Sequence, residues 1–598
     1  MSFAASNERY VPYQSIEVPS TNGLSYQPSN QSIIHLEIPD FINFIDPEQT
    51  YLKLDLQLAG APAPLVCREH AGVNSCIQRI RILSGDGVLI EEIDDYNVWV
   101  ANRMKYENDE PENLKRTFTE GTYDSKDIRD QPYFIMGGRT AAADVTAVTY
   151  NTNTFCIPLR TGLFESRHIL PIAAMGGLRI EIHLVQDPRK ALSRHPCQSQ
   201  TTGEVLSNQS TDGVGDGLNP TAPVANASTD LYYQGRLTAK PVVAGNKDVE
   251  VYGCQFGQDG ATTAPYAEGA LNANNPWRAG DVAQVYDKDN LKVNTADFPV
   301  TNLSYENPQS ASAHFKMTGG AGFATPTFAA DDNSGPYKLR GQYSTNGQET
   351  TAPNFTISNV AMVCGQITPG SAYEGALQRR VASGEGLSID IKSIQEYKQT
   401  LASSITTSST YLPIVNSRIY SIFTIPTIQE SYSFASGMNA DEHVLLGLND
   451  TISQYQWYYD GQLHPNRRVP CCANTAGGTA QGGRGKGRAL GRPTDTSNIM
   501  EQHHFYELVK AWENCGYRVR DIRGANKAFV MGRALSKYGQ TYDARGKDFQ
   551  LNIERTSNNE TAAGSTLFYN SAVDLLLHTF VCHLRRLRVT PTGVEVDL

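Results

Sequence analysis

The sequence contains no apolar run that approaches the roughly 18–20 residues of a membrane-spanning helix, so we expect no transmembrane segment. Residues 1–10 also lack the basic and apolar segments that together mark a secretory signal peptide. Both absences argue against a secreted or membrane-anchored protein. We therefore expect the chain to be made and kept in the cytosol or nucleus of the producing cell.

Charged side chains are scarce as well, at 19% of the 598 residues, whereas 50 Gly, 30 Pro and 30 Tyr are present. Many turn-forming residues, many aromatic residues and few charges favour an all-β chain over a helical one. The hydrophobic content of 40% is that of a folded protein. One hydrophobic core does not suffice at this length, and two to four domains are expected.

An excess of positive charge is also missing, because the net charge is −11. A protein that wraps nucleic acid needs a basic surface, so no sequence-specific nucleic-acid partner is predicted. The ten Cys residues show no repeating spacing. In a reducing compartment we expect them to be buried or idle thiols.

Several segments alternate between apolar and polar residues with a period of two. In residues 52–58 four Leu alternate with Lys, Asp and Gln, which puts every Leu on one face of a strand. Side chains spaced in this way would wind right round a helix, so an amphipathic helix is excluded. Further strands are predicted on the same grounds, or from β-branched and aromatic content, at 34–38, 178–184, 355–363, 387–391, 411–428 and 580–589.

One arrangement of elements occurs twice. Two strands flank an Asp-Gly turn at residues 84–87, and a helix is predicted at 95–106. Later, two strands flank Asp460-Gly461, and a helix is predicted at 501–512. Asp-Gly supplies the positive backbone angles of a tight hairpin turn. We interpret the recurrence as two domains of one type.

Residues 187–354 shift to Ser, Thr, Asn, Gly and Ala but keep many aromatic residues, which a disordered linker would lack. We predict a large, mostly irregular, folded insertion there and a domain boundary within 371–386. The fold predicted is all-β: two consecutive eight-stranded antiparallel jelly-roll sandwiches with short helices. Their expected extents are an N-terminal arm at 1–30, a first jelly roll at 31–385 and a second at 386–598, with a flexible Gly/Arg loop at 473–492.

Four segments resemble, in order, parts of one known family. The first is residues 38–54, which contain the opening strands, and the second is residues 155–184 (FCIPLRTGLFESRHILPIAAMGGLRIEIHL). The third is residues 455–470 (YQWYYDGQLHPNRRVP) together with the predicted helix at 501–512, and the fourth is the closing stretch 529–589. This series is similar to the double jelly-roll major capsid proteins of the PRD1/adenovirus lineage. It lies nearer to those of Polinton-like viruses and virophages than to the longer adenovirus hexon.

The resemblance implies a structural protein rather than an enzyme. Members of that family form homotrimers whose six jelly rolls give a pseudo-hexagonal capsomer of an icosahedral virion. It further implies contacts with neighbouring capsomers, a penton protein and minor or cement capsid proteins. The insertion at 187–354 would form outer towers, where a host receptor would bind.

Motifs for catalysis are not found. The loop at 477–491 (GGTAQGGRGKGRALG) is not a P-loop, because Gly485-Lys486 is followed by Gly487 where Ser or Thr is required. No G-x-S-x-G elbow occurs. The same loop has basic residues without nearby acids, and we hypothesise that they contact an acidic neighbour or the genome: Arg484, Lys486, Arg488 and Arg492.

Metal sites are not predicted either. His503 and His504 are adjacent on a predicted helix and point roughly 100° apart, so they cannot face one ion as an i, i+4 pair would. Cys471 and Cys472 would suit a metal or oxidation, but idle thiols are the simpler interpretation. A run of carboxylates is expected to be a solvated face or helix start: Glu91, Glu92, Asp94 and Asp95. No catalytic, cofactor-binding or metal-binding residue, and no cofactor, is therefore predicted.

The alternative is a carbohydrate-binding or carbohydrate-processing β-sandwich protein. Such a protein would be expected to carry a secretion signal and exposed Trp platforms, and the chain has four Trp. A single-roll vertex protein is a third possibility, which two rolls disfavour.

Overall fold

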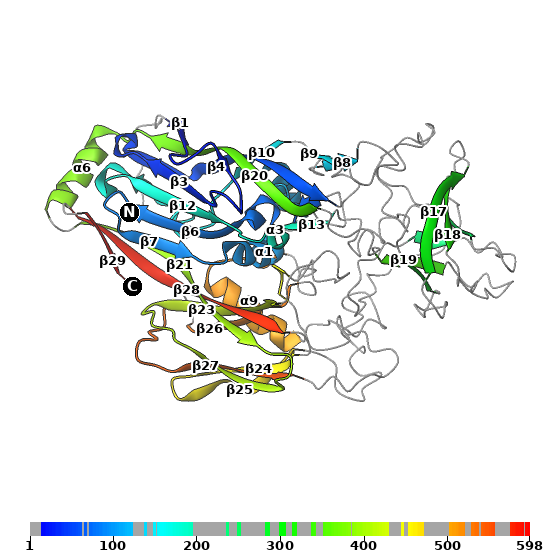
Figure 1. The fold of residues 1–598 in the computed structure, drawn as a ribbon. Helices are drawn as coiled ribbons and strands as arrows, with labels where there is room; N and C mark the ends of the chain where they lie inside the picture. The colour runs from blue at the N-terminus through cyan, green and yellow to red at the C-terminus, as the bar shows by residue number, and fades with distance from the viewer. Residues whose placement is uncertain are drawn as a thin grey trace.

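The computed structural model describes residues 13–61, 65–68, 71–122, 137–139, 148–150, 152–194, 235–237, 248–252, 282–286, 298–306, 314–319, 337–342, 351–383, 386–429, 444–447, 452–471, 502–520, 528–536, 540–555, 574–590 and 593–597. Figure 1 shows two stacked β-sandwiches with short helices between them and a smaller barrel to one side.

The first sandwich consists of two antiparallel sheets. Sheet A has the order β1 (Tyr13–Pro19), β20 (Thr351–Ile367), β4 (Phe44–Ala61) and β10 (Asn153–Ile157). Sheet B has the order β3 (Ile33–Ile38), β12 (Leu178–Leu184), β6 (Ile77–Ser84) and β7 (Leu89–Ile93). Short strands flank them: β2 (Ser25–Tyr26) and β11 (Leu170–Pro171) join sheet A, β5 (Leu65–Cys67) pairs β13 (Leu192–Arg194), and β8 (Gly137–Arg139) pairs β9 (Val148–Tyr150).

The second sandwich repeats this plan. Sheet C has the order β21 (Leu387–Leu401), β28 (Leu575–Thr590), β23 (Ile419–Ile428) and β26 (Met531–Ala534), and β29 (Gly593–Asp597) pairs β28. Sheet D has the order β22 (Thr407–Leu412), β27 (Phe549–Arg555), β24 (Ile452–Tyr459) and β25 (Gln462–Pro470).

The two sandwiches share one strand order. When the main-path strands of each sandwich are numbered along the chain, sheets A and C both read 1-8-3-6, and sheets B and D both read 2-7-4-5. This alternation of strands between two facing sheets is the jelly-roll topology. The predicted all-β class and the two antiparallel jelly rolls are therefore confirmed, and we call the two sandwiches the first and second roll.

The predicted hairpins and helices occupy equivalent places in the two rolls. Strands 4 and 5 of each roll are joined at the Asp-Gly turns, where Gly87 and Gly461 have φ of +83° and +73°. Helices follow strand 5 in each roll: α1 (Tyr96–Glu107) and α2 (Glu110–Glu120) in the first, and α9 (Gln502–Asn514) in the second. Three helices of the described chain were not predicted: α2, the short α3 (Pro188–Ala191) that follows β12, and α6 (Ser371–Ala382), which lies in the segment between the rolls.

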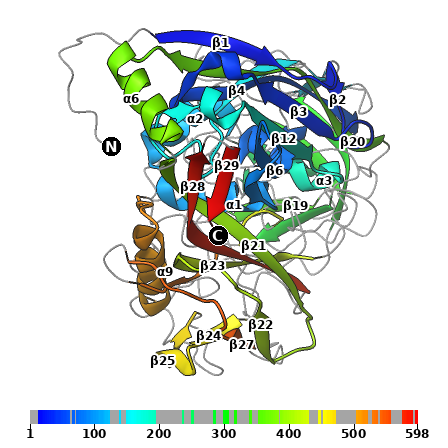
Figure 2. The same cartoon turned by 90° about the vertical axis from the view of Figure 1, so that its left-hand side faces the viewer.

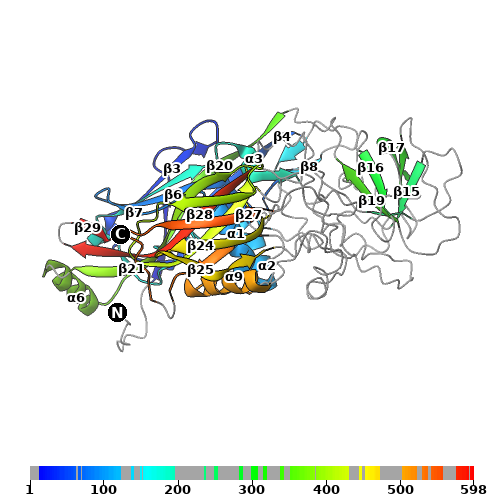
Figure 3. The ribbon, with the colours of Figure 1, turned by 90° about the horizontal axis from the view of Figure 1, so that it is seen from below.

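One expectation about a connecting segment needs correction. Residues 13–19, expected within an N-terminal arm, form the edge strand β1, because their backbone pairs with β20 from Tyr13↔Ile367 to Pro19↔Ala361. Within the insertion at 187–354, six strands close into a barrel that was not predicted. They are β14 (Gly235–Leu237), β15 (Asp248–Tyr252), β18 (His314–Gly319), β17 (Phe298–Glu306), β16 (Val282–Tyr286) and β19 (Tyr337–Gln342). Figures 1 and 3 show this barrel beyond the end of the rolls opposite α6.

The inner strand β23 of sheet C is buried on both of its faces. All ten residues of β23 are buried. Ile422 of β23 packs in the core of the second roll, whereas Phe423 belongs to the cluster that continues into the first roll. A strand covered on both faces reads as a continuous apolar run, which is why residues 419–428 show no simple alternation. In the part of the chain that is described, no helix is long and apolar enough to cross a membrane.

Candidate functional site

Helix α1 joins the two rolls and is buried on every side. All residues from Tyr96 to Tyr106 are buried. A helix at the surface would expose one polar face, so burial all round places α1 between two packed bodies. Figures 1 and 2 show it between sheet B and sheet C. We call this contact region the seam: Asp95 and α1 of the first roll against sheet C and α9 of the second.

Aromatic rings fill the centre of the seam. The ring centroid of Trp99 in α1 lies 5.4 Å from that of Trp512, 5.3 Å from that of Phe580 and 5.7 Å from that of Phe423. Phe423 and Trp512 stack on each other at 4.2 Å. Tilted and stacked pairs at such distances contribute about 0.5–1.5 kcal/mol each beyond the burial of their area. Tyr517 is a fourth partner of Trp99, at 6.1 Å. Trp99 comes from the first roll and all four partners come from the second, so these contacts hold the rolls together.

Polar groups of α1 also bond to the second roll. The side-chain amide of Asn102 donates to the carbonyl of Leu445 at 2.7 Å and accepts from the backbone N–H of Gly447 at 3.0 Å. The carbonyl of Tyr106 accepts from the backbone N–H of Arg520 at 2.8 Å. Because these buried groups are satisfied across the seam, separating the rolls would leave them without partners.

At Gly162 the two backbones approach closely. A Cβ atom added there would lie 2.1 Å from the carbonyl oxygen of Lys392 on β21. The buried carboxylate of Glu91 accepts from the backbone N–H groups of Gly162 at 2.9 Å and Leu163 at 3.1 Å. Burial nevertheless raises the pKa of Glu91 above its ordinary value. A glycine is thus required where the first roll meets the second.

An ion cluster lies at one end of the seam, and we define it as Asp95, Lys190, Glu396, Lys398 and His578. Nδ1 of His578 lies 2.6 Å from a Glu396 oxygen and 3.1 Å from Oδ2 of Asp95. Nζ of Lys398 lies 2.6 Å from Oδ2 of Asp95, and Nζ of Lys190 lies 3.5 Å from Oδ1. The side chains of Asp95, Glu396 and His578 are each 1% exposed. The cluster therefore joins α1 and α3 of the first roll to β21 and β28 of the second.

The charges of the cluster shift each other's pKa values. Burial alone would lower the pKa of His578, but its hydrogen bonds to Asp95 and Glu396 outweigh burial, and the pKa is raised. Burial raises the pKa of Glu396, and the charge of Asp95 adds to this. Burial would raise the pKa of Asp95 too, but His578, Lys190 and Lys398 hold it well below its usual range. The arrangement thus favours an ionised Asp95 and a proton retained between His578 and Glu396.

The backbone at Asp95 is also unusual. Asp95 precedes α1 with φ 38° and ψ 47°, which is the left-handed region, and its side chain makes no capping hydrogen bond to the helix. Non-glycine residues adopt this region uncommonly, and Asp is among those that tolerate it best. The carboxylate is turned toward the second roll instead of toward the helix N-terminus that it precedes.

The donor atoms of Asp95, Glu396 and His578 lie within 4.8 Å of one another, which is the spacing of a metal site. The ammonium of Lys398, however, already lies 2.6 Å from the Asp95 carboxylate. Lys190 adds a second positive charge beside the same carboxylate. A cation there would meet like charges at contact distance, so we interpret the cluster as an ion-pair network rather than a metal centre.

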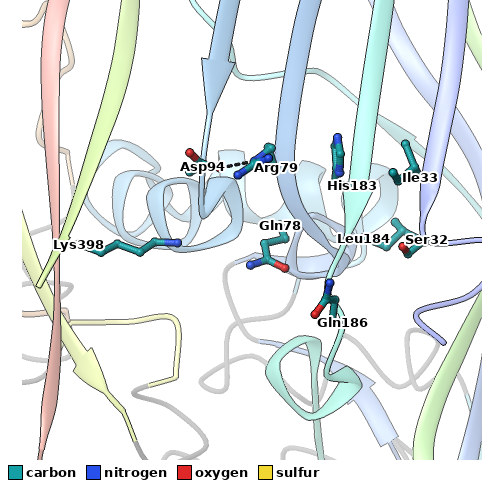
Figure 4. Close-up of a pocket in the computed structure, with 9 residues that line it drawn as sticks. All are labelled: Ser32, Ile33, Gln78, Arg79, Asp94, His183, Leu184, Gln186 and Lys398. Carbon is teal, nitrogen blue, oxygen red and sulfur yellow. Dashed lines mark hydrogen bonds and ion pairs between the residues drawn. The ribbon is translucent and has the colours of Figure 1, made fainter. Parts of the chain in front are cut away.

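A small cavity of about 240 Å³ opens beside the ion cluster. Lys398 reaches into it from β21 of the second roll, and the other lining residues come from the first roll (Figure 4). The lining residues are Ser32, Ile33, Gln78, Arg79, Asp94, His183, Leu184, Gln186 and Lys398. Arg79 and Asp94 form an ion pair with each other there. The cavity gives solvent a route to the Lys398 side chain, which is 40% exposed.

The two adjacent histidines lie in different surroundings, as predicted. His504 is buried, stacks on Phe529 at 4.8 Å and lies 3.3 Å from the hydroxyl of Tyr455. Burial lowers the pKa of His504 to about 3. His503 is 41% exposed and lies 4.0 Å from a carboxylate oxygen of Glu507. The two rings therefore do not converge on one point.

Several other predicted residues lie outside the described part of the chain. These are Cys472 and the basic residues of the 473–492 loop: Arg484, Lys486, Arg488 and Arg492. Cys471 is described, and its side chain is buried.

The expectation for the carboxylate run was wrong in part. Glu91 is 1% exposed and lies in β7, so it belongs neither to a solvated face nor to a helix start. Asp95 does stand at a helix start, directly before α1, but it too is only 1% exposed. Glu91 is held by backbone N–H groups and Asp95 by three cations, so burial of both charges is compensated. Glu92 and Asp94 do lie at the surface, paired with Arg79.

Sequence reasoning missed Glu396 and His578. Both lie beyond the strand segments predicted at 387–391 and 580–589, and β21 and β28 extend far enough to include them. In the pairing of β21 with β28, Lys398 directly opposes His578. His578 continues the phase of Phe580 and Cys582, and a polar residue on the apolar face of a strand was the one signal available. It does not tell which distant residue will be the partner.

The fold defines a double jelly-roll protein. No protein-family model and no curated protein matches the chain. Among solved structures, the chain is similar to PBCV-1 VP54 fitted into a reconstruction of the virophage Sputnik, with 8% identity, a TM-score of 0.46 and 100% of both chains covered. It is also similar to the PBCV-1 virus capsid, with 8% identity, a TM-score of 0.44 and 100% of both chains covered. The chain is likewise similar to the Faustovirus major capsid protein, with 8% identity, a TM-score of 0.44, and coverage of 99% of this chain and 92% of that chain. At these values the likenesses carry no functional argument, and the assignment of the fold rests on the strand order.

Proposed function

We propose that the chain is a structural major capsid protein that forms homotrimeric, pseudo-hexagonal capsomers of an icosahedral virion. One observation carries this proposal: a single chain holds two jelly rolls of identical strand order, fixed to each other by a buried helix. Three such chains around a threefold axis place six similar rolls in a ring. A ring of six similar bodies has a nearly hexagonal outline, and hexagons tile a surface.

The rigid seam suits this role. A tile must keep a constant angle between its rolls, because each roll contacts a different neighbour. Obligate interfaces commonly bury about 2,000–5,000 Å² and are relatively apolar. Large apolar side chains that are more than half exposed on the described surface are available for burial between copies, namely Leu24, Phe41, Phe118, Tyr411, Val415 and Tyr506.

The finer assignments follow from the same proposal. We assign the first roll to 31–385 together with β1, the second roll to 386–598, and the barrel in the 187–354 insertion to an outer tower that meets a host receptor. Expected partners are neighbouring capsomers, a penton protein and minor or cement proteins. The expected location is the capsid shell, after synthesis in the host cytoplasm or nucleus. The role is assembly, not catalysis.

The solution mass of the chain tests the proposal. Expressed alone, the chain should have three times its mass of 65.6 kDa and a hexagonal outline in negative stain. Single substitutions to Glu at the exposed apolar positions, such as Phe41→Glu and Val415→Glu, test the interface between copies. At least one should yield monomers whose melting temperature is unchanged, because exposed side chains contribute little to the monomer's core. A wild-type monomer that binds sugars would favour the carbohydrate-binding alternative.

The basic loop gives a second test. The quadruple Ser variant at Arg484, Lys486, Arg488 and Arg492 should assemble or package genome poorly if the loop contacts an acidic neighbour or the genome. Particles with normal yield and genome content would refute that contact. The capsomer mass is the control, since the proposal for the rolls does not depend on the loop.

A further inference from the structure

We propose that Asp95, Glu396 and His578 form a pH-sensitive latch between the two rolls, closed at neutral and mildly acidic pH and released as the solution becomes alkaline. The latch is a property of the fold and does not rest on the proposed role in a capsid.

The geometry fixes where the critical proton lies. Nδ1 of His578 faces two carboxylates, at 2.6 Å from Glu396 and 3.1 Å from Asp95. Nε2 of the same ring lies 3.0 Å from the hydroxyl of Thr427 on β23. Nδ1 must carry hydrogen in either charge state, because otherwise three acceptors would face one another in a buried site. The proton whose loss makes the ring neutral is therefore the one on Nε2, where the Thr427 hydroxyl can donate a hydrogen bond instead. His578 is the one cationic group of the cluster that is fully buried, since Lys190 and Lys398 are 18% and 40% exposed.

Among the described residues, the charged groups around His578 come from both rolls. From the first roll come Asp95, before α1, and Lys190 on α3, which reaches the same carboxylate. From the second roll come Glu396 and Lys398, both on β21. On its own strand the neighbouring ring is Phe580, stacked at 6.3 Å, which has no charge.

Loss of the proton would weaken the seam specifically. Without it, the imidazole is neutral, and the two buried carboxylates retain only the partly exposed lysines as counter-charges. Breaking one part of a buried ion network leaves uncompensated charge and is strongly unfavourable. Asp95 belongs to the first roll, whereas Glu396 and His578 belong to the second. Separating the rolls exposes these carboxylates to water, so the strain is relieved by opening at the seam rather than within one roll.

The direction of the pH dependence follows from the shifts already described. The pKa values of His578 and Glu396 are raised in the folded chain. A group with a raised folded pKa stabilises the fold fully below its unfolded pKa, which is 6.5 for His578, and this contribution is lost as the pH rises through the folded pKa. Because one proton is bound in the closed state and not in the open state, the equilibrium constant for opening rises roughly tenfold per pH unit between the unfolded and the folded pKa.

The experiment uses the full-length chain with His578→Gln, and with His583→Gln as the matched control. His583 is buried on the same strand, its pKa is lowered to about 4 by burial, and it lies outside the cluster. Hydrogen exchange is measured from pH 6 to 9.5, and exchange in α1 is divided by exchange in β24 of the same sample, so that the intrinsic pH dependence cancels.

For the wild type and His583→Gln, the ratio should rise with pH above 6.5 by up to roughly tenfold per unit. For His578→Gln, the ratio should be high at pH 6 and level throughout. A flat wild-type profile, or an alkaline rise retained by His578→Gln, would overturn the latch. Zinc chloride and a chelator form a further arm. If zinc lowers the ratio in wild type but not in His578→Gln, and the chelator reverses this, the cluster is a cation site and the latch is overturned as well.

Discussion

The substitution Trp99→Ala should uncouple the two rolls. Trp99 is fully buried, and it contacts Trp512, Phe580 and Phe423 of the second roll at centroid distances of 5.4, 5.3 and 5.7 Å. The first roll contributes one further ring, Tyr106, which lies 6.0 Å from Trp512, so Trp99 supplies most of these contacts among the described residues. Removing the indole therefore empties the centre of the seam while the strands of both rolls remain intact.

The size of the effect follows from the burial. Replacing a buried Trp by Ala typically costs about 3–5 kcal/mol, of which the aromatic pairs supply about 0.5–1.5 kcal/mol each. Folded domains are stable by only about 5–15 kcal/mol, so the loss is a large share of the coupling between the rolls. We expect Trp99→Ala to unfold in two separate steps in urea, the rolls melting independently, where the wild type unfolds in one.

The matched control is Trp457→Ala. Trp457 is as fully buried as Trp99, but it lies in the core of the second roll, away from the seam. This variant should lose a similar free energy of unfolding and keep a single transition, because the seam is intact. Urea unfolding followed by far-UV circular dichroism distinguishes the two outcomes. If Trp99→Ala unfolded in one step at the wild-type midpoint, the reasoning about the seam would be refuted.

Three further predictions concern the first roll, the second roll and the insertion. Carboxylate oxygens of Glu120 lie 2.9 Å from guanidinium nitrogens of Arg116 and of Arg160. Glu120→Gln should lower the free energy of unfolding by about 3–5 kcal/mol, because it leaves buried guanidinium charges uncompensated; urea unfolding at pH 7 measures this. Burial would raise the pKa of Glu120, but the two Arg hold it at about 2, so the wild type should lose this contribution as the pH falls from 4.5 toward 2, and Glu120→Gln should not. Burial lowers the pKa of His504 to about 3. The free energy of unfolding should therefore fall by on the order of 4 kcal/mol as the pH drops from 6.5 toward 3. An equally steep fall of the unfolding free energy in a His504→Phe variant would contradict this. Replacing residues 195–350 by a short Gly-Ser linker should leave the trimer intact and abolish attachment to host cells, as measured by solution mass and a binding assay.

Much of the fold could be predicted because its signals are local. The alternation in residues 52–58 and 178–184 corresponds to strands β4 and β12, and the helices at 95–106 and 501–512 are displaced by only one or two residues at either end. Asp-Gly turns mark both hairpins because positive φ at glycine is a property of the turn itself. The jelly-roll topology came from the resemblance of whole segments, since strand order depends on contacts between distant residues.

The candidate site could not be predicted for the same reason. Asp95 stands in a run of four acids that reads as a solvated surface, and its burial depends on His578 and Lys398, which belong to the other roll. Helix α1 shows no amphipathic pattern because both of its sides are covered. The barrel was missed because its strands are short and widely separated along the chain, and closure depends on pairing between them.

Sheet C also determines where the chain can be divided. One of its faces completes the interior of the second roll, and the other carries Phe423 and Phe580 against α1. A fragment that starts at β21 would present those rings to water and should aggregate, although α6 resembles a convenient linker. Whoever wishes to display a foreign peptide or build a truncated version should therefore keep the two rolls in one polypeptide and alter the chain at the barrel insertion instead.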